Sequence, residues 1–159
     1  MQITYQAIGV IHTPFKDLAG MPIQPQGEAS AQGSAEVFPE YAEGLKDLGG
    51  FSHVILLYHL HAVHRVDLTV TPFLGSEVRG IFATRAPTRP NPIGLSVVKL
   101  EGIDGNLLHL GTVDILDGTP LLDIKPYVPE FDHPEGARAG WLEAVKGKVR
   151  QTRSDTRFG

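Results

Sequence analysis

The stretch Arg85-Ala-Pro-Thr-Arg-Pro-Asn-Pro-Ile-Gly-Leu-Ser96 carries three prolines, one glycine, two arginines and one asparagine in twelve residues. Proline fixes its own φ and lacks a backbone donor, so this stretch is neither a helix interior nor a central strand. Each proline also biases the preceding residue, here Ala86, Arg89 or Asn91, toward extended geometry. We therefore predict a stiff loop that holds two guanidinium groups and an amide in fixed directions. Such a loop suits either a ligand site or a plain turn between two strands.

Short strand-like segments separated by turn residues surround this loop. Residues 94–103 have the pattern of a strand, and the tight turn Asp104-Gly105-Asn106 leads into a second strand over 107–115. The apolar residues 51–63 predict a buried strand. Further strands are expected over 5–12, 34–38, 66–71, 78–84 and 121–125, a short helix over 39–48, and a helix or strand over 141–149. Many short strands with little helix predict a mainly β fold, either a barrel or a sandwich.

The composition is that of an ordinary globular domain. The chain has 159 residues, of which 42% are hydrophobic and 20% charged, and no apolar run approaches the roughly 18 residues of a membrane span. The N-terminus lacks the basic and hydrophobic regions of a signal peptide. The absence of cysteine excludes disulfides, thiolate catalysis and Cys-based zinc sites. We expect a cytoplasmic protein without a membrane partner.

Charge is unevenly distributed along the chain. The net charge is −4, yet residues 138–159 contain six Lys or Arg against two acids, and the preceding residues hold the other 8 basic and 16 acidic side chains. We therefore divide the chain into a domain over 1–137 and a basic tail over 138–159. Such a tail indicates either a polyanionic partner or a solvated terminal segment.

The common cofactor and nucleophile motifs are missing. The sequence has no G-x-G-x-x-G after a strand, no phosphate-binding loop of the G-x-x-x-x-G-K-[ST] type and no G-x-S-x-G elbow. His53, His59 and His61 would share one face of a regular strand, where they could ligate a metal or serve as packing and ligand contacts. We expect no metal site.

A second polar segment follows the predicted strand pair. Asp117, Asp123 and Lys125 could bind hydroxyl or ammonium groups. Alternatively, Asp117 begins a turn, while Asp123 and Lys125 form a same-face pair on a strand. Residues 16–32 are poor in hydrophobic side chains and predict a long loop, and loops of this length in a compact domain are usually functional or mobile.

The two polar stretches together resemble the paired signatures of the TsaA-like (TrmO) family. Residues 85–96 and 117–127 carry the likeness, and Ile8-Gly-Val-Ile-His-Thr-Pro14 and Phe51-Ser-His53 extend it to about residues 8–132. The resemblance implies an S-adenosylmethionine-dependent methyltransferase on a small single-domain β-barrel with one or two short helices, without a Rossmann sheet. It also implies methylation of N6 of threonylcarbamoyladenosine beside the anticodon of threonine tRNAs, by a homodimer with the cofactor near the subunit boundary.

The resemblance also implies which residues contact the cofactor. These are Pro22, Ile23, Gln24, His61, Ala62, Arg85, Leu95, Asp117, Gly118, Thr119 and Pro120. Further residues match the family motifs without an assigned role, namely Arg89, Asn91, Asp123, Lys125 and Tyr127. Ala62 replaces a polar residue common in bacterial members. Longer members carry an additional C-terminal domain, whereas this chain ends soon after the predicted barrel. A non-catalytic S-adenosylmethionine- or RNA-binding barrel is therefore the alternative.

Methyl transfer from a sulfonium is an in-line displacement, so alignment of the reactants carries much of the barrier. The adenine amine is a weak nucleophile, and an acceptor for its proton would assist the reaction. Candidate acceptors are Asp117, Asp123 and His61. We expect the cofactor to be bound by Arg85, whereas Arg89 serves the fold, the dimer or the RNA. The basic tail, with Arg65 and Arg79, could hold RNA phosphates.

Overall fold

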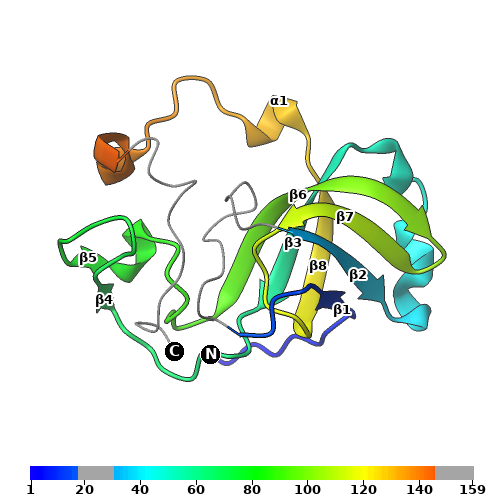
Figure 1. The fold of residues 1–159 in the computed structure, drawn as a ribbon, viewed down its shortest axis with the longest axis horizontal. Helices are drawn as coiled ribbons and strands as arrows, with labels where there is room; N and C mark the ends of the chain where they lie inside the picture. Colours follow the sequence, from blue (N-terminus) through cyan, green and yellow to red (C-terminus); the bar gives the residue numbers. More distant parts are fainter. Residues whose placement is uncertain (18–30, 146–159) are drawn as a thin grey trace.

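A closed barrel of antiparallel strands forms the body of the molecule in the computed structural model (Figure 1). The structure describes residues 1–17 and 31–145. Neighbouring strands follow the order β1-β2-β7-β6-β3-β8. These strands are β1 (Gly9–His12), β2 (Ala31–Val37), β3 (His53–His59), β6 (Ile93–Asp104), β7 (Leu107–Val113) and β8 (Thr119–Pro126). The mainly β barrel predicted from the sequence is confirmed.

Strand β6 shows how the sequence pattern builds the barrel wall. Successive side chains of a strand point to opposite faces, and in β6 the buried positions alternate with exposed ones. Gly94, Ser96 and Val98 face the interior, while Leu95 on the outer face is 46% exposed. At the end of the strand, Gly105 adopts a φ of +58°, which a glycine accepts without strain, and the chain turns back into β7 as predicted.

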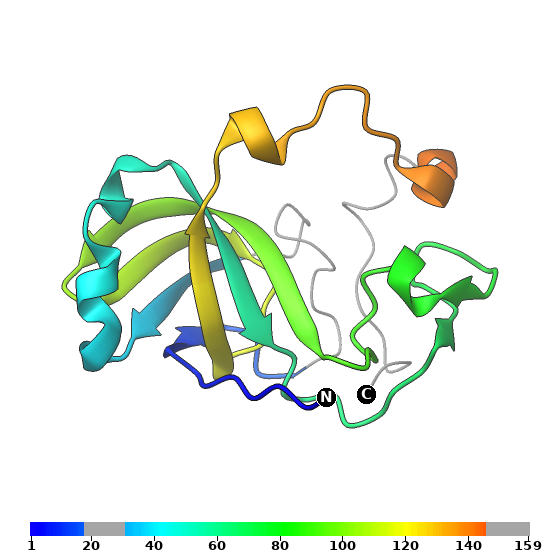
Figure 2. The same ribbon diagram turned by 180° about the vertical axis from the view of Figure 1, so that it is seen from behind.

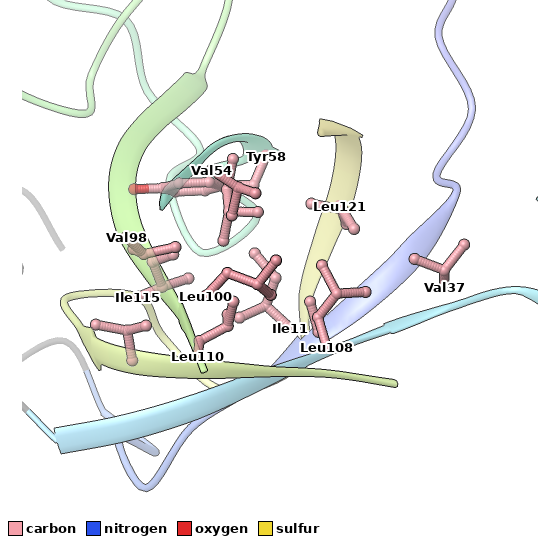
Figure 3. Packing of buried hydrophobic residues seen from close by; sticks show 13 residues of the cluster. Ile11, Val37, Val54, Tyr58, Val98, Leu100, Leu108, Leu110, Ile115 and Leu121 are labelled. Carbon is pink, nitrogen blue, oxygen red and sulfur yellow. The ribbon is translucent and has the colours of Figure 1, made fainter. Parts of the chain in front are cut away.

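Aliphatic side chains from all six barrel strands fill the interior (Figure 3). The largest fully buried side chains include Ile11, Leu56, Leu108, Leu110 and Leu121. The barrel closes where β1 pairs with β8, Ile11 opposite Thr119 and Gly9 opposite Leu121. Burial of the apolar side chains inside stabilises this closed arrangement. The barrel therefore has a packed core rather than a channel.

A small arm, which we define as residues 66–84, stands apart from the barrel (Figure 1). It consists of β4 (Thr69–Val70), β5 (Arg79–Gly80) and the 3₁₀ turn η3 (Ile81–Ala83). The strands predicted over 66–71 and 78–84 were therefore too long. Their apolar side chains do not line one buried face, since Val66, Leu68 and Val78 are each more than half exposed. Val70, Ile81 and Ala86 form a separate small core.

The remaining differences concern where one strand begins and which kind of helix follows β2. The strand predicted over 5–12 begins only at Gly9, because residues 1–6 are exposed and pair with no strand. The helix predicted over 39–48 is instead two 3₁₀ segments, η1 (Pro39–Leu45) and η2 (Leu48–Gly50), neither of which buries a residue. The left-handed φ of +66° at Asp47 separates them.

The segment after β8 crosses from the barrel to the arm (Figure 2). It contains the short helix α1 (Pro129–Asp132) and the 3₁₀ segment η4 (Gly140–Val145). Trp141 anchors this segment, because its Nε1 donates to the Ala83 carbonyl at 2.8 Å and the Arg79 guanidinium lies 5.4 Å from its ring centre. The described part of the predicted helix or strand over 141–149 is thus 3₁₀. Within residues 1–17 and 31–145, no helix has the length and apolarity of a membrane span.

The antiparallel order gives the barrel two different ends. At one end, which we call the mouth, β1, β3 and β7 finish and β2, β6 and β8 begin. The chain between β3 and β6, including the stretch 85–92, and the β7–β8 connection both lie at the mouth. The β6–β7 hairpin and η1 lie at the opposite end (Figure 1). The topology therefore gathers at one end segments that are distant in sequence.

Candidate functional site at the barrel mouth

The two arginines of the proline-rich loop have different surroundings. Arg89 Nη1 donates to the carbonyls of Ile81 at 3.2 Å, Thr84 at 2.9 Å and Ala86 at 3.4 Å. Its guanidinium also lies 5.8 Å from the ring centre of Phe82. Arg89 therefore ties the loop to the arm, which favours a role in the fold among the three roles left open by the sequence.

Arg85, in contrast, is exposed at the start of the loop. Among the described residues it forms no hydrogen bond and no ion pair. Its positive charge nevertheless lies close enough to Tyr58 and Asp114 to lower the pKa of both, as the last and weakest of the influences on each group. An arginine without a protein partner is available to an anionic ligand.

A chain of hydrogen bonds connects three polar side chains inside the mouth. Ser96 Oγ donates to Asp114 Oδ1 at 2.8 Å, and because that proton is used, the Tyr58 hydroxyl donates to Ser96 Oγ at 2.9 Å. Tyr58 and Ser96 are buried, with 6% and 2% of their surfaces exposed, and Figure 3 shows the Tyr58 hydroxyl directed at β6. The carboxylate of Asp114 is thereby fixed at the end of β7.

Burial controls the ionisation of this chain. It raises the pKa of Tyr58 far above its ordinary value, and the neighbouring Asp114 charge raises it further. Burial also raises the pKa of Asp114, against the hydrogen bond from Ser96 and the charge of Arg85, which lower it. The Tyr58 hydroxyl thus stays a neutral donor. The Asp114 carboxylate is poorly solvated, so a positively charged group beside it would stabilise it.

Gly94 provides the space that Tyr58 occupies. The two residues are directly paired across β3 and β6, and a Cβ atom at Gly94 would lie only 2.1 Å from Tyr58 Cε2. Gly94 belongs to the proline-rich motif, so the motif fixes both the loop above the mouth and the ring inside it.

The turn at Asp117 closes the mouth against the end of β1. Asp117 Oδ1 accepts from the Thr13 backbone N–H at 2.9 Å, and Oδ2 forms an ion pair with Lys16. The Lys16 ammonium, together with the Thr13 N–H, lowers the pKa of Asp117. Gly118 has a φ of +74° and donates its N–H to the Ile11 carbonyl at 2.9 Å. Asp117 therefore begins a turn, as the alternative interpretation of the sequence has it.

His61 contacts the beginning of β8. Its Nδ1 lies 3.3 Å from Thr119 Oγ1, and that hydroxyl donates its proton to the Leu116 carbonyl at 2.7 Å. Thr119 is therefore the acceptor, Nδ1 carries the proton, and Nε2 of the neutral ring keeps a free lone pair. Ala62 follows in the same half-buried turn.

The other predicted site residues lie in several places. Leu95 and Asp123 flank Leu57 on the outer face of the barrel, and Asp123 forms an ion pair with Lys125 at 2.8 Å. Pro120 pairs with Val10 on the adjacent strand, and Asn91 is an exposed residue of the loop. Pro22, Ile23 and Gln24 lie outside the described residues.

Two of the predicted residues lie at the end of the barrel opposite the mouth. The ring centre of Tyr127 is 6.3 Å from that of His53, the first residue of β3. His59 is six residues further along the strand, roughly 20 Å away, and His61 lies beyond the strand end. His53 and His59 thus share the outer face of β3, as expected, whereas His61 does not belong to the strand, so the three histidines do not form one group. No group of three or more His, Asp or Glu within 1–17 and 31–145 is placed to hold a metal.

A shallow depression of about 550 Å³ lies beside the mouth, between β1 and β2. Its basic groups include His12, Lys16 and His109. Each of them already has a carboxylate partner within 4.0 Å, namely Glu36 or Asp117 for His12, Asp117 for Lys16 and Asp104 for His109. The depression consequently presents little free positive charge to an anion.

Sequence reasoning missed Tyr58, Gly94 and Asp114 as site residues. Asp114 lies between Val113 and Ile115, which are both fully or almost fully buried, and a lone acid between two core residues was the available signal. No pattern in the sequence indicates that Tyr58 pairs with Gly94, because the pairing depends on the register between two strands that are distant in sequence.

Comparisons with known proteins agree with this architecture. Residues 10–133 match the family described as tRNA-methyltransferase O N-terminal domain. A Pyrococcus abyssi protein described as a probable S-adenosyl-L-methionine-binding protein is 54% identical over 99% of this chain and 86% of its own length. The tRNA (adenine(37)-N6)-methyltransferase of Escherichia coli is 37% identical over 89% of this chain and 64% of its own length.

Among solved structures, the crystal structure of TrmO from Pseudomonas aeruginosa superposes with a TM-score of 0.73. It is 40% identical, and the match covers 89% of this chain and 63% of the crystallised chain. The chain thus spans under two thirds of both bacterial TrmO relatives. With the family match over most of the chain and identities above one third, the protein belongs to the tRNA-methyltransferase O N-terminal domain family.

Proposed function

We propose that this protein transfers a methyl group from S-adenosylmethionine to N6 of an adenosine in tRNA, specifically threonylcarbamoyladenosine beside the anticodon. The observation that carries the proposal is the meeting of both sequence signatures at the mouth. Ser96 of the first signature donates to Asp114, three residues before the second, and the charge of Arg85 acts on Asp114. Relatives named as S-adenosylmethionine-binding proteins and as a tRNA adenine methyltransferase support it.

The cofactor supplies a methyl group on a sulfonium, which is already an activated leaving group. The protein's contribution is to align this group with the adenine amine and to exclude competing water. Arg85 can bind an anionic group of the cofactor, and the backbone of the Asp117–Pro120 turn lines the same mouth. His61 and Thr119 connect the ends of β3 and β8 beside it.

His61 is the best placed of the three candidate proton acceptors. The Asp117 carboxylate is occupied by Thr13 and Lys16, and its lowered pKa makes it a weaker base. Asp123 is paired with Lys125 on the outer face. His61 keeps a free Nε2 lone pair, so its ring can accept a proton without first breaking a contact.

We further propose that the protein acts as a homodimer. The arm exposes a group of apolar side chains that a second copy would cover. These are Val66, Leu68, Val78 and Phe82, between 57% and 77% exposed. Burial of such a patch supplies the main driving force for association. Leu68→Glu should shift the dimer to monomer in light scattering, whereas an unchanged mass would argue against this surface.

The partner in this proposal is tRNA, so we place the activity in the cytoplasm. An anticodon loop presents unstacked bases that the mouth can receive. Among the described residues, Arg65 and Arg79 pair with Asp67 and Glu77, so phosphate contacts there would have to displace these surface carboxylates.

The proposed function is tested by nucleoside mass spectrometry of tRNA from a deletion strain, with and without the gene restored. Loss of methylated threonylcarbamoyladenosine in the deletion and its return on restoration would support the proposal. The names of the archaeal relatives favour a second candidate, a cofactor-binding barrel without transfer activity. Binding of S-adenosylmethionine with an unchanged nucleoside profile would support that candidate instead.

A further inference from the structure

The positive charge of Arg85 acts on the Asp114 carboxylate at the mouth, yet the two groups form no ion pair. The Asp114 carboxylate is held from one side by the Ser96 hydroxyl, and no Lys, Arg or His in the described part of the chain pairs with it. Arg85 is exposed and likewise has no partner within residues 1–17 and 31–145. The two side chains come from different loops that the barrel topology brings to one end.

The carboxylate is held as a binding group would be. Ser96 is 2% exposed and Tyr58 is 6% exposed, and their hydroxyls form a one-directional chain that ends on Oδ1 of Asp114. Side chains locked by buried hydrogen bonds keep a fixed orientation before a ligand arrives. Asp114 itself remains partly exposed, so the fixed carboxylate can be reached from the mouth.

An ionised carboxylate in such surroundings is costly to the fold unless a cation compensates it. Burial raises the pKa of Asp114, and the Arg85 charge offsets this only weakly. A residue with a purely structural role could accept the Ser96 hydrogen bond equally well through an amide oxygen. A positively charged partner would therefore stabilise the Asp114 carboxylate, and no described residue forms an ion pair with it.

A free cation beside a fixed anion is the complement of an α-amino-acid zwitterion. We propose that Asp114 and Arg85 together bind the amino-acid end of the cofactor, Asp114 holding its α-ammonium group and Arg85 its α-carboxylate. This inference rests on the proposed use of S-adenosylmethionine and names the residues that recognise one end of it. If the inference is right, the amino-acid end of the cofactor contributes to the binding affinity in addition to the nucleoside.

The test compares two ligands that share the adenosine and the sulfur atom. S-adenosylhomocysteine carries the amino-acid moiety, whereas 5′-methylthioadenosine lacks it. Calorimetric titration of the wild-type protein should show tighter binding of S-adenosylhomocysteine. Asp114→Asn should weaken S-adenosylhomocysteine about tenfold to a hundredfold, the range for a lost charged hydrogen bond, and leave 5′-methylthioadenosine unchanged. Asp104→Asn, at the opposite end of the barrel, is the matched control and should change neither affinity.

A second measurement uses unmodified protein and so does not depend on the folding of a variant. The analogue of S-adenosylhomocysteine without its α-amino group should bind the wild-type protein about as weakly as Asp114→Asn binds the complete ligand. Equal losses for both ligands in Asp114→Asn, or full affinity for the deamino analogue, would overturn the inference while leaving the proposed function standing. Failure of the wild-type protein to bind S-adenosylhomocysteine and S-adenosylmethionine at all would overturn both.

Discussion

Replacing Gly94 by alanine tests whether Tyr58 is fixed in the barrel as the structure has it. The new Cβ would lie 2.1 Å from Cε2 and 2.5 Å from Cζ of the Tyr58 ring. Because the ring is buried and its hydroxyl is hydrogen-bonded to Ser96, it cannot move aside without losing packing and a polar contact. Overpacking of this kind costs about 1–3 kcal/mol, and alanine in place of a strand glycine recovers roughly 0.5–1 kcal/mol.

Thermal unfolding measures this loss. A chain of this length loses about 2–4 °C of Tm per kcal/mol, so Gly94→Ala should melt up to roughly 10 °C below the wild type. The control is Gly102→Ala on the same strand, where a Cβ would meet no atom within 4 Å and the Tm should be unchanged or slightly higher. In combination with Tyr58→Val, which removes the ring, Gly94→Ala should cost much less than it does alone. A Gly94→Ala Tm equal to that of Gly102→Ala, or strictly additive effects with Tyr58→Val, would refute this packing argument.

Three further predictions concern the mouth and the arm. Arg89→Met should lower the free energy of unfolding by about 1–3 kcal/mol and speed hydrogen exchange in the arm, because it removes the donor shared by three carbonyls. Arg85→Met should keep the wild-type Tm and lose affinity for S-adenosylhomocysteine. The reverse pattern would contradict the different roles assigned to the two arginines. The Lys16 ammonium lowers the pKa of Asp117 in the folded state. The Asp117 carboxylate therefore stabilises the fold above its unfolded-state pKa, and this stabilisation is lost as the pH falls through its folded-state pKa. Asp117→Asn should flatten the acid side of the Tm–pH curve, and an unchanged curve would count against the Lys16–Asp117 ion pair. Trp141→Phe removes the indole hydrogen bond to the arm and should make the segment after β8 more sensitive to limited proteolysis, with the barrel Tm unaffected.

Local turn chemistry made part of the fold predictable. The turn at Asp104-Gly105-Asn106 is specified by residues that favour positive φ, and the strands on both sides formed as expected. Strand lengths in the arm were not predictable in the same way. Val66 and Leu68 have strand-like composition, but whether a strand forms there depends on what covers it, and in this structure both side chains are exposed.

The candidate site was predictable only in outline. The proline-rich loop marked one wall of the mouth, but Arg85 and Arg89 carry the same functional group, and only the carbonyls around Arg89 distinguish them. Asp114 looked like one more polar residue beside a turn, and its role depends on the Ser96 hydroxyl, 18 residues earlier in the chain. Contacts of this kind arise from barrel closure, which no local pattern encodes.

Methyl transfer from S-adenosylmethionine to adenosine N6 in tRNA can be measured directly in vitro. Purified protein would be incubated with trideuteromethyl-labelled S-adenosylmethionine and tRNA from the deletion strain, and the digested nucleosides analysed by mass spectrometry. We expect a labelled methyl group on N6 of threonylcarbamoyladenosine and a much smaller yield with Arg85→Met. Folded, cofactor-binding protein that labels no adenosine, or labels another atom, would contradict it.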